Sequence, residues 1–345
     1  MNERLTRAFE GLQRGLAALT DPRRPEVDRT PRDQVLGTGK LRLLRYRRDS
    51  PPRHATPLLL VPPFLVRPYI FDLHPGRSMV AFLLSEGFDV FLVDFGVPDL
   101  LDQHLKMDDY VLDFLPSAVD GVRMASGQQL VTPVGYCVGG LFSLLFAATA
   151  GRERVRNLAL LAVPVDYQKM GLISVLVHAA HRELDFAIDK IGNIPGVIPA
   201  LGMQLANPLA AVSRYADLLT NATNREYVQN WQSLSTWMKE FIPGPKDAYR
   251  DFFNDYVVDN ALLTGQAVIG GQSVDLKQIT CPLLAVAGEG DPVATTESAR
   301  AIIELVGSPD REFFSVPGGH IGVVAGGRAP KFSWRKLADW LAERS

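Results

Sequence analysis

Residues 130–150 read LVTPVGYCVGGLFSLLFAATA, and this stretch decides the fold. It opens with a short apolar run, turns at GYCVGG (residues 135–140), and continues with small and apolar residues at helical length. Glycine is needed where the backbones of a strand and the next helix pass closely, because a Cβ atom would not fit there. The pattern predicts a strand, a sharp turn with Cys137 at its centre, and a helix directly after it.

This predicted turn resembles the nucleophile elbow of the α/β-hydrolase fold, in which the central residue of G-x-S-x-G occupies a strained turn. Cys137 stands where that motif has serine. Helix-end amides and a neighbouring imidazolium favour a thiolate at such a position. A cysteine in an apolar segment is usually a small core residue, but the flanking glycines favour the nucleophile here.

The composition excludes several other classes of protein. The 345 residues are 47% hydrophobic and 21% charged with a net charge of −2, so neither nucleic acid nor an anionic membrane is an expected partner. Cys137 and Cys281 form neither a disulfide framework nor a metal knuckle, and we interpret Cys281 as structural. His178 and His181 alone make a poor metal site, so no metal is expected. The chain has no apolar run of membrane-spanning length and no signal-peptide pattern at MNERLTR, so we expect a cytoplasmic protein.

Short apolar runs alternate with helical stretches on both sides of the elbow. Besides the elbow strand, we expect strands at residues 41–46, 57–61, 89–94, 157–163, 282–287 and 312–316, and helices at 77–86 and 108–125. Continuous Val, Leu and Ile runs of this length are typical of strands buried on both faces of a parallel sheet. The predicted fold is therefore an α/β-hydrolase fold, a doubly wound, mostly parallel sheet with a largely helical cap insertion.

The cap is expected at residues 164–275, which break the alternation. Helical patches occur there at 171–191, 208–221, 226–241 and 248–260, and no convincing parallel strand is found. An insertion at this point would cover the carboxyl edge of the sheet, where open α/β sheets bind ligands. The α/β core would then consist of residues 38–163 and 276–345.

Residues 1–37 are expected to contain a helix and a linker. Apolar residues recur with helical spacing over residues 2–20, at Leu5, Phe9, Leu12, Leu16 and Leu19. We favour docking of this helix on the protein itself over binding to a partner. Residues 21–34 are rich in proline and arginine and are interpreted as a linker.

Two polar residues follow predicted strands beyond the cap. Asp291 ends the segment VAGEGD, and His320 ends VPGGH after the last strand. Each alone has a structural explanation, as a turn residue or a loop cap. Their order after the nucleophile is that of α/β-hydrolases, so the combination favours a catalytic triad. Asp94 also follows a strand but precedes the nucleophile, which indicates a structural or supporting role.

The triad assigns a role to each residue. Cys137 would attack an acyl carbonyl, His320 would take and return the proton, and Asp291 would hold the imidazole in the productive tautomer. The backbone amide of Val138 and an amide near Phe64, in the loop after residues 57–61, would hold the oxyanion.

With these residues in place, the chain resembles the polyhydroxyalkanoate synthase family, in particular its short, class III-like type. The resembling segments, in the family's order, are VPP at 61–63, YIFDL at 69–73, YVLD at 110–113, the GYCVGG box, NPL at 207–209 with RY at 214–215, NAL at 260–262, GGQSVDL at 270–276 and GGHI at 318–321. The resemblance implies the Cys137, Asp291 and His320 triad, a hydroxyacyl-CoA thioester as substrate without a further cofactor, and a cap that opens. It also implies the growing polyester as a partner and association with polymer granules, and it leaves open a homodimer or a second synthase subunit.

We therefore predict an acyltransferase that loads a 3-hydroxyacyl group from CoA onto Cys137 and transfers it to a hydroxyl, forming polyester. The segments DFGVPD at 94–99 and DPVAT at 291–295 depart from the family pattern. These departures leave open a hydrolase on the same scaffold (an acyl-CoA thioesterase or an intracellular polyester depolymerase) and a catalytically silent granule-associated relative. An apolar pocket would exclude water and favour transfer. Its expected lining is Phe64, Leu65, Val66, Ile194, Val197, Ile198, Leu201 and Met203.

Overall fold

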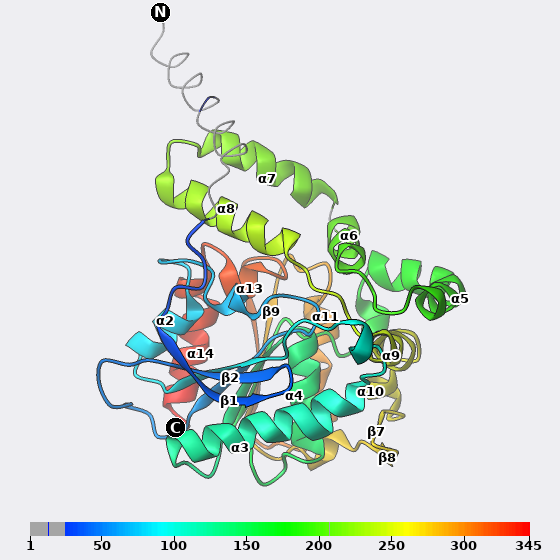
Figure 1. The fold of residues 1–345 in the computed structure, drawn as a ribbon, viewed down its shortest axis with the longest axis horizontal. Helices are drawn as coiled ribbons and strands as arrows, with labels where there is room; N and C mark the ends of the chain where they lie inside the picture. Colours follow the sequence, from blue (N-terminus) through cyan, green and yellow to red (C-terminus); the bar gives the residue numbers. More distant parts are fainter. Residues whose placement is uncertain (1–12, 14–24, 207) are drawn as a thin grey trace, which may run out of the picture.

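A central eight-stranded sheet organises the molecule (Figure 1). The computed structural model describes Gln13 and residues 25–206 and 208–345. The strands are β1 (Arg32–Thr38), β2 (Leu41–Tyr46), β3 (Leu58–Val61), β4 (Val90–Asp94), β5 (Thr132–Tyr136), β6 (Leu158–Leu161), β9 (Leu283–Gly288) and β10 (Arg311–Val316). Their order in the sheet is β1-β2-β4-β3-β5-β6-β9-β10, and all neighbours from β4 to β10 are parallel. The predicted doubly wound, mostly parallel sheet is confirmed.

The central strands are apolar because helices cover both of their faces. Every residue of β3, β5, β6 and β9 is buried. Along β3, Leu58 and Leu60 pack into one hydrophobic core, and Leu59 and Val61 pack into the other. Side chains of a strand alternate between the two faces, so a continuous apolar run supplies both cores.

Helices from both sides complete these two cores. One core contains residues of α2 (Met79–Ser85), α13 (Gly322–Ala325) and α14 (Ser333–Ala342). The other contains residues of α3 (Leu115–Ser126) and α4 (Val138–Ala148). Outside residues 170–275, the structure also describes α11 (Thr296–Arg300), α12 (Ile302–Leu305), the 3-10 helices η1 (Pro68–Phe71), η2 (Leu100–Asp102), η4 (Tyr167–Lys169), η6 (Leu276–Gln278) and η7 (Ala329–Lys331), and the π-helix η3 (Asp109–Phe114).

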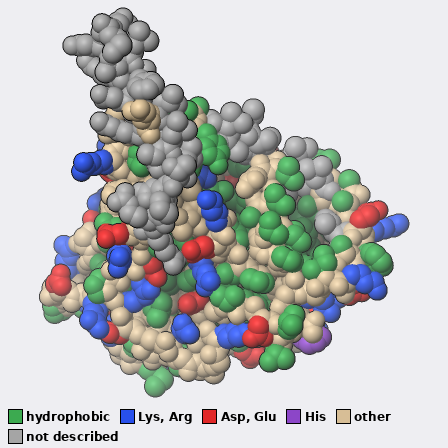
Figure 2. Space-filling view, turned by 45° about the horizontal axis from the view of Figure 1, so that its top comes forward, with side chains coloured by type: hydrophobic (Ala, Val, Ile, Leu, Met, Phe, Trp, Pro, Cys, Tyr) green, Lys and Arg blue, Asp and Glu red, His purple; other side chains and the backbone are tan. Residues whose placement is uncertain are grey.

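The interval between η4 and η6 is mainly helical. It contains α5 (Leu172–Ile191), α6 (Val197–Ala206), α7 (Pro208–Thr220), α8 (Arg225–Lys239), α9 (Lys246–Asp251), the π-helix η5 (Phe252–Val258), α10 (Ala261–Thr264) and a short hairpin of β7 (Val268–Ile269) and β8 (Gln272–Ser273). Helices α5 to α8 lie at one end of the sheet (Figure 1), and hydrophobic side chains gather on the side where α5 and α6 lie (Figure 2). The boundaries of a separate cap subdomain and its opening stay predictions.

Polar contacts join α8 to the core below it. The indole Nε1 of Trp237 donates to the carbonyl oxygen of Arg67 at 2.8 Å, and the ring of Trp237 is buried. At the other end of α8, Arg77 and Glu226 form an ion pair of 3.0 Å. The helix is therefore held to the loop after β3 and to the segment before α2.

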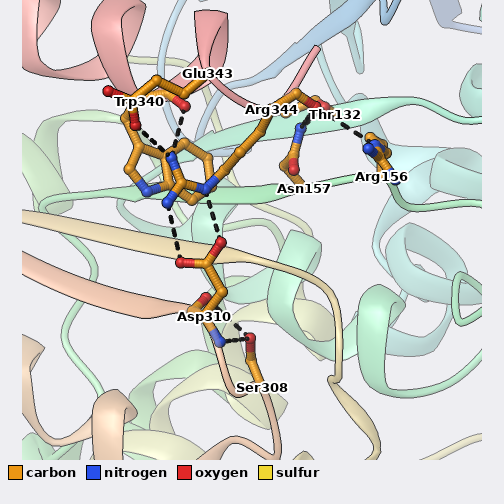
Figure 3. Close-up of polar contacts among 8 residues, drawn as sticks. All are labelled: Thr132, Arg156, Asn157, Ser308, Asp310, Trp340, Glu343 and Arg344. Atoms are coloured by element: carbon orange, nitrogen blue, oxygen red, sulfur yellow. Dashed lines mark hydrogen bonds and ion pairs between the residues drawn. The ribbon is translucent and has the colours of Figure 1, made fainter.

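The C-terminal helix is tied to β10 by an arginine. Figure 3 shows the guanidinium of Arg344 facing the carboxylate of Asp310, with Nε–Oδ2 and Nη2–Oδ1 distances of 2.8 and 3.0 Å. The same guanidinium lies 4.6 Å from the ring centre of Trp340. The bidentate geometry fixes the end of α14 against the sheet.

The N-terminal predictions have two different outcomes. The helix expected over residues 2–20 lies outside the described residues apart from Gln13. The linker expected at 21–34 is wrong at its end, because β1 begins at Arg32 and pairs antiparallel with β2. The sheet therefore begins before residue 38. Polar residues in β1, which is mostly exposed, conceal the strand in the sequence.

Candidate active site

Cys137 occupies the turn between β5 and α4 in a strained conformation. Its φ and ψ angles are 52° and −125°, a region that residues with a side chain rarely adopt. Its amide donates to the carbonyl oxygen of Leu161 at 3.0 Å, and its own carbonyl accepts from the amide of Gly140 at 2.9 Å. Hydrogen bonds on both sides of the residue hold the strained turn in place.

The glycines of the GYCVGG box are required by close contacts with the backbone and with one side chain. A Cβ atom on Gly139 would lie 2.2 Å from the carbonyl oxygen of Val61 at the end of β3. A Cβ on Gly140 would lie 2.1 Å from Cγ2 of Val163, and one on Gly135 would lie 2.4 Å from the Cα of Gly140. The strand–turn–helix predicted from these glycines is confirmed.

Asp291 and His320 meet at the carboxyl ends of β9 and β10. The Nδ1 atom of His320 lies 2.8 Å from Oδ2 of Asp291. The other carboxylate oxygen accepts hydrogen bonds from the amides of Val293 and Ala294 at 2.8 and 2.9 Å. Since these amides belong to the residues that follow Asp291, the local turn itself orients the carboxylate toward the imidazole.

His320 also reaches Cys137. Burial opposes a charge on the imidazole, but the Asp291 carboxylate and then the Cys137 side chain favour it, so the pKa of His320 is raised well above its usual value. A side-chain hydrogen bond with Cys137 contributes to the same shift. The three residues predicted as a triad are thus brought together, with His320 between the thiol and the carboxylate.

The residues expected to hold an oxyanion lie on two neighbouring segments. Val138 is the first residue of α4, where a helix leaves its amides without intrahelical acceptors. Phe64 follows β3, and its buried ring packs against Tyr110 and Phe142. The contact of Val61 with Gly139 places the loop after β3 against the start of α4.

Cys137 and His320 open into one apolar cavity of about 500 Å³. Of the eight residues expected to line it, Leu65, Val66, Ile198, Leu201 and Met203 do so. The lining also includes an aromatic wall that the sequence analysis missed, formed by Tyr136, Trp237, Phe241, Tyr249, Phe252 and Phe253. The helical spacing of aromatic residues at 249, 252 and 253 was the available signal. Phe64 and Ile194 are buried away from the cavity, and Val197 faces solvent.

The other polar residues noted in the sequence have local structural contacts. Oδ1 of Asp94 accepts the amide of Gly96 at 2.9 Å and closes the turn after β4. Burial raises the pKa of Cys281 to about 11, which keeps its thiol protonated.

Among the residues that the structure describes, no group of three His, Cys, Asp or Glu side chains could hold a metal ion. No helix in this described part is long and apolar enough to cross a membrane.

The fold and the site define a protein of the α/β-hydrolase class with cysteine at the nucleophile position. A model of the α/β-hydrolase fold matches residues 70–326. The monoacylglycerol lipase of Paleococcus ferrophilus superposes with a TM-score of 0.51 at 16% identity over 88% of this chain and 99% of its own. An α/β-hydrolase fold protein from Nakamurella multipartita gives a TM-score of 0.50 at 17% identity over 90% of this chain and 99% of its own. At these identities the likeness concerns the fold alone.

Sequence relatives narrow this class to a family. A model of the N-terminal region of poly-β-hydroxybutyrate polymerase (PhaC) matches residues 26–83. The poly(3-hydroxyalkanoate) polymerase subunit PhaC of Haloferax mediterranei is 35% identical over 92% of this chain, which spans 65% of the relative's length. The subunits of the same name from Allochromatium vinosum and Synechocystis are 34% and 31% identical, over 96% and 92% of this chain and 94% and 86% of their own. The chain belongs to the poly(3-hydroxyalkanoate) polymerase PhaC family.

Proposed function

We propose that this protein polymerises 3-hydroxyacyl groups, taking each from a CoA thioester onto Cys137 and transferring it to a hydroxyl of the growing polyester. The observation that carries the proposal is the shared cavity: Cys137 and His320 both line it, and Asp291 binds the far side of the imidazole. An apolar cavity at a nucleophile suits an acyl chain.

The first half of the proposed cycle acylates the cysteine. His320 takes the thiol proton, and the thiolate of Cys137 attacks the thioester carbonyl to form a tetrahedral oxyanion. The amides of Val138 and Phe64 stabilise that oxyanion. When the carbon–sulfur bond to CoA breaks, His320 returns the proton to the CoA thiolate, and an acyl-Cys137 thioester remains. One thioester replaces another, so this step is close to thermoneutral.

The second half transfers the acyl group to an alcohol. His320 takes the proton of a hydroxyl, whose oxygen attacks the acyl-Cys137 carbonyl, and the proton passes to the departing thiolate of Cys137. An ester replaces a thioester, so this step runs downhill. Asp291 stabilises the imidazolium of His320 in both halves of the cycle and keeps the Nδ1 atom of His320 turned away from the substrate.

The apolar lining favours transfer over hydrolysis. Water entering the site would convert acyl-Cys137 into free hydroxy acid, which is the outcome expected of a thioesterase. Aromatic and aliphatic side chains dominate the cavity beside the thiol, and few polar groups are present there to hold a water molecule. Hydrolysis is therefore the second candidate, with free acid as a minor product.

The proposal includes the partners that the family implies. The growing polyester is one, and a second copy of the chain or a second synthase subunit is the other. The protein would work in the cytoplasm at the surface of polymer granules, with CoA thioester as substrate and no further cofactor.

Trapping the acyl-enzyme tests the proposal. Brief incubation with 3-hydroxybutyryl-CoA should release CoA and add one hydroxybutyryl mass to a peptide that contains Cys137. Cys281→Ser should behave like the wild type, because this thiol lies outside the cavity. Cys137→Ala should release no CoA above background. CoA release that survives Cys137→Ala would overturn the proposal.

A further inference from the structure

Helix α6 combines an apolar sequence with wide solvent exposure. None of its residues is buried, and Val197, Leu201 and Leu205 are 61%, 51% and 64% exposed. The sequence contains no charged residue between Lys190 and Arg214. Exposed helices normally carry charges, and an exposed contiguous apolar patch marks a binding surface. Figure 2 shows the hydrophobic side chains gathered on this side of the molecule.

The same helix forms one wall of the catalytic cavity. Ile198, Leu201 and Leu205 line the cavity together with Cys137 and His320, although all three are also exposed to solvent. Residues at i, i+3 and i+7 lie on one face of a helix. A continuous apolar surface therefore leads from the thiol along α6 to the outside.

Gly202 leaves open space on this path. It lies inside α6 and lines the cavity, yet a Cβ atom on it would meet no atom of the described residues beyond its own stretch of helix within 4 Å. Glycine inside a helix is destabilising relative to alanine. The protein's own packing does not require glycine at this position, so the empty space beside it has room for a bound molecule.

We propose that the growing polyester chain leaves the site along α6, passing Gly202 and resting on Leu201 and Leu205. This inference rests on the proposed function, since it takes polyester as the product. A polyester of hydroxyacyl units has an apolar surface without charges, and it matches the uncharged helix. Each new unit enters at Cys137 and pushes the chain outward along this face.

The test uses variants of Gly202 and compares the loading of the first acyl unit, measured as CoA release, with elongation, measured as polymer length. Gly202→Leu alters the cavity lining, so polymer length is compared at equal extents of the first, single-turnover release of CoA from 3-hydroxybutyryl-CoA. It should lower polymer length by about tenfold, because the added side chain occupies the exit path. Gly202→Ala is the matched control and should give polymer close to wild-type length.

A second pair of variants tests the outer end of the path. Leu205→Glu places a charge where the chain is expected to rest and should shorten the polymer. Met124→Glu, at an 86% exposed site on α3, is its control and should have no effect. Wild-type protein that forms no ester would overturn the proposed function. If the wild type forms polymer and Gly202→Leu and Leu205→Glu form polymer of the same length, the exit path alone would be overturned. If Gly202→Leu does not fold, the polymer length of Leu205→Glu decides the question.

Discussion

His320 and Asp291 form a buried pair in which Nδ1 lies 2.8 Å from Oδ2, and only 5% of either residue is exposed. The pair leaves Nε2 as the imidazole nitrogen available to Cys137. The carboxylate is itself held by two backbone amides, and His320 also contacts Cys137, so Asp291, His320 and Cys137 form one connected chain of contacts.

Substitutions at these two positions should differ in severity. His320→Ala removes the base for both half-reactions, and we expect turnover to fall by about 10²- to 10⁴-fold. Asp291→Asn should be less severe, because a thiol needs less help from an orienting acid than a hydroxyl does. Initial rates of CoA release measure both effects, with Asp94→Asn as the control. An active Asp291→Asn variant with an inactive Asp94→Asn variant would transfer the acid role to Asp94.

The raised pKa of His320 predicts a pH-dependent stability. Its folded-state pKa lies above the unfolded value of about 6.5, so protonation of His320 favours the folded state. This contribution is complete below about pH 6.5 and is lost as the pH rises through the folded-state pKa. The Tm difference between wild type and Asp291→Asn should therefore shrink as the pH rises above about 6.5. Asp33→Asn, which breaks the exposed Arg47 pair, should show a constant difference over the same range. A difference at Asp291 that grows with pH would contradict the assignment of charges.

The two cysteines should react at very different rates. The thiol of Cys281, with a pKa of about 11, remains protonated near neutral pH, whereas Cys137 lies at a helix start beside His320. Iodoacetamide should label Cys137 well before Cys281, as peptide mass mapping would show. His320→Ala should slow labelling of Cys137 and leave Cys281 unchanged. Preferential labelling of Cys281 would refute the reactive role of Cys137.

The strained turn predicts that glycine at position 137 gives a more stable protein than alanine does. At φ 52° and ψ −125°, Cys137 adopts the mirror image of an extended conformation, which glycine accepts without strain. Strain of this kind costs about 1–3 kcal/mol, and glycine avoids it. The greater conformational entropy of glycine in the unfolded chain offsets roughly 0.5–1 kcal/mol of that gain. Cys137→Gly should thus be more stable than Cys137→Ala by about 0.5–2 kcal/mol in urea unfolding. Equal stabilities would show that the turn stores no strain.

The sequence predicted the structure best at positions where a single physical cause explains the residue type found there. Close packing requires glycine at 135, 139 and 140, and the fully buried strands are visible in the sequence as apolar runs. These two signals were enough to predict the elbow and the buried strands of the sheet. They also placed Asp291 and His320 at the carboxyl ends of strands, since each residue follows a strand.

Features that depend on distant partners were not accessible in the same way. Strand β1 forms because it pairs antiparallel with the edge of β2, and its own residues are mostly exposed and polar. Helix α6 contains glycine and proline and is apolar on every side, so no alternation of apolar and charged residues marks it as a helix in the sequence. The aromatic wall of the cavity joins Tyr136 to Tyr249 and Phe252, which only the folded chain brings together.

The most direct test of the central claim is the product formed by the wild-type protein from 3-hydroxybutyryl-CoA. CoA release should be followed together with the molecular mass of the product and the amount of free 3-hydroxybutyrate, both for the protein alone and with a second synthase subunit added. The account predicts ester-linked polymer, with free acid as a minor product and no polymer from Cys137→Ala. One equivalent of free acid for each CoA released at every substrate concentration, with no ester in either preparation, would contradict it and identify a thioesterase.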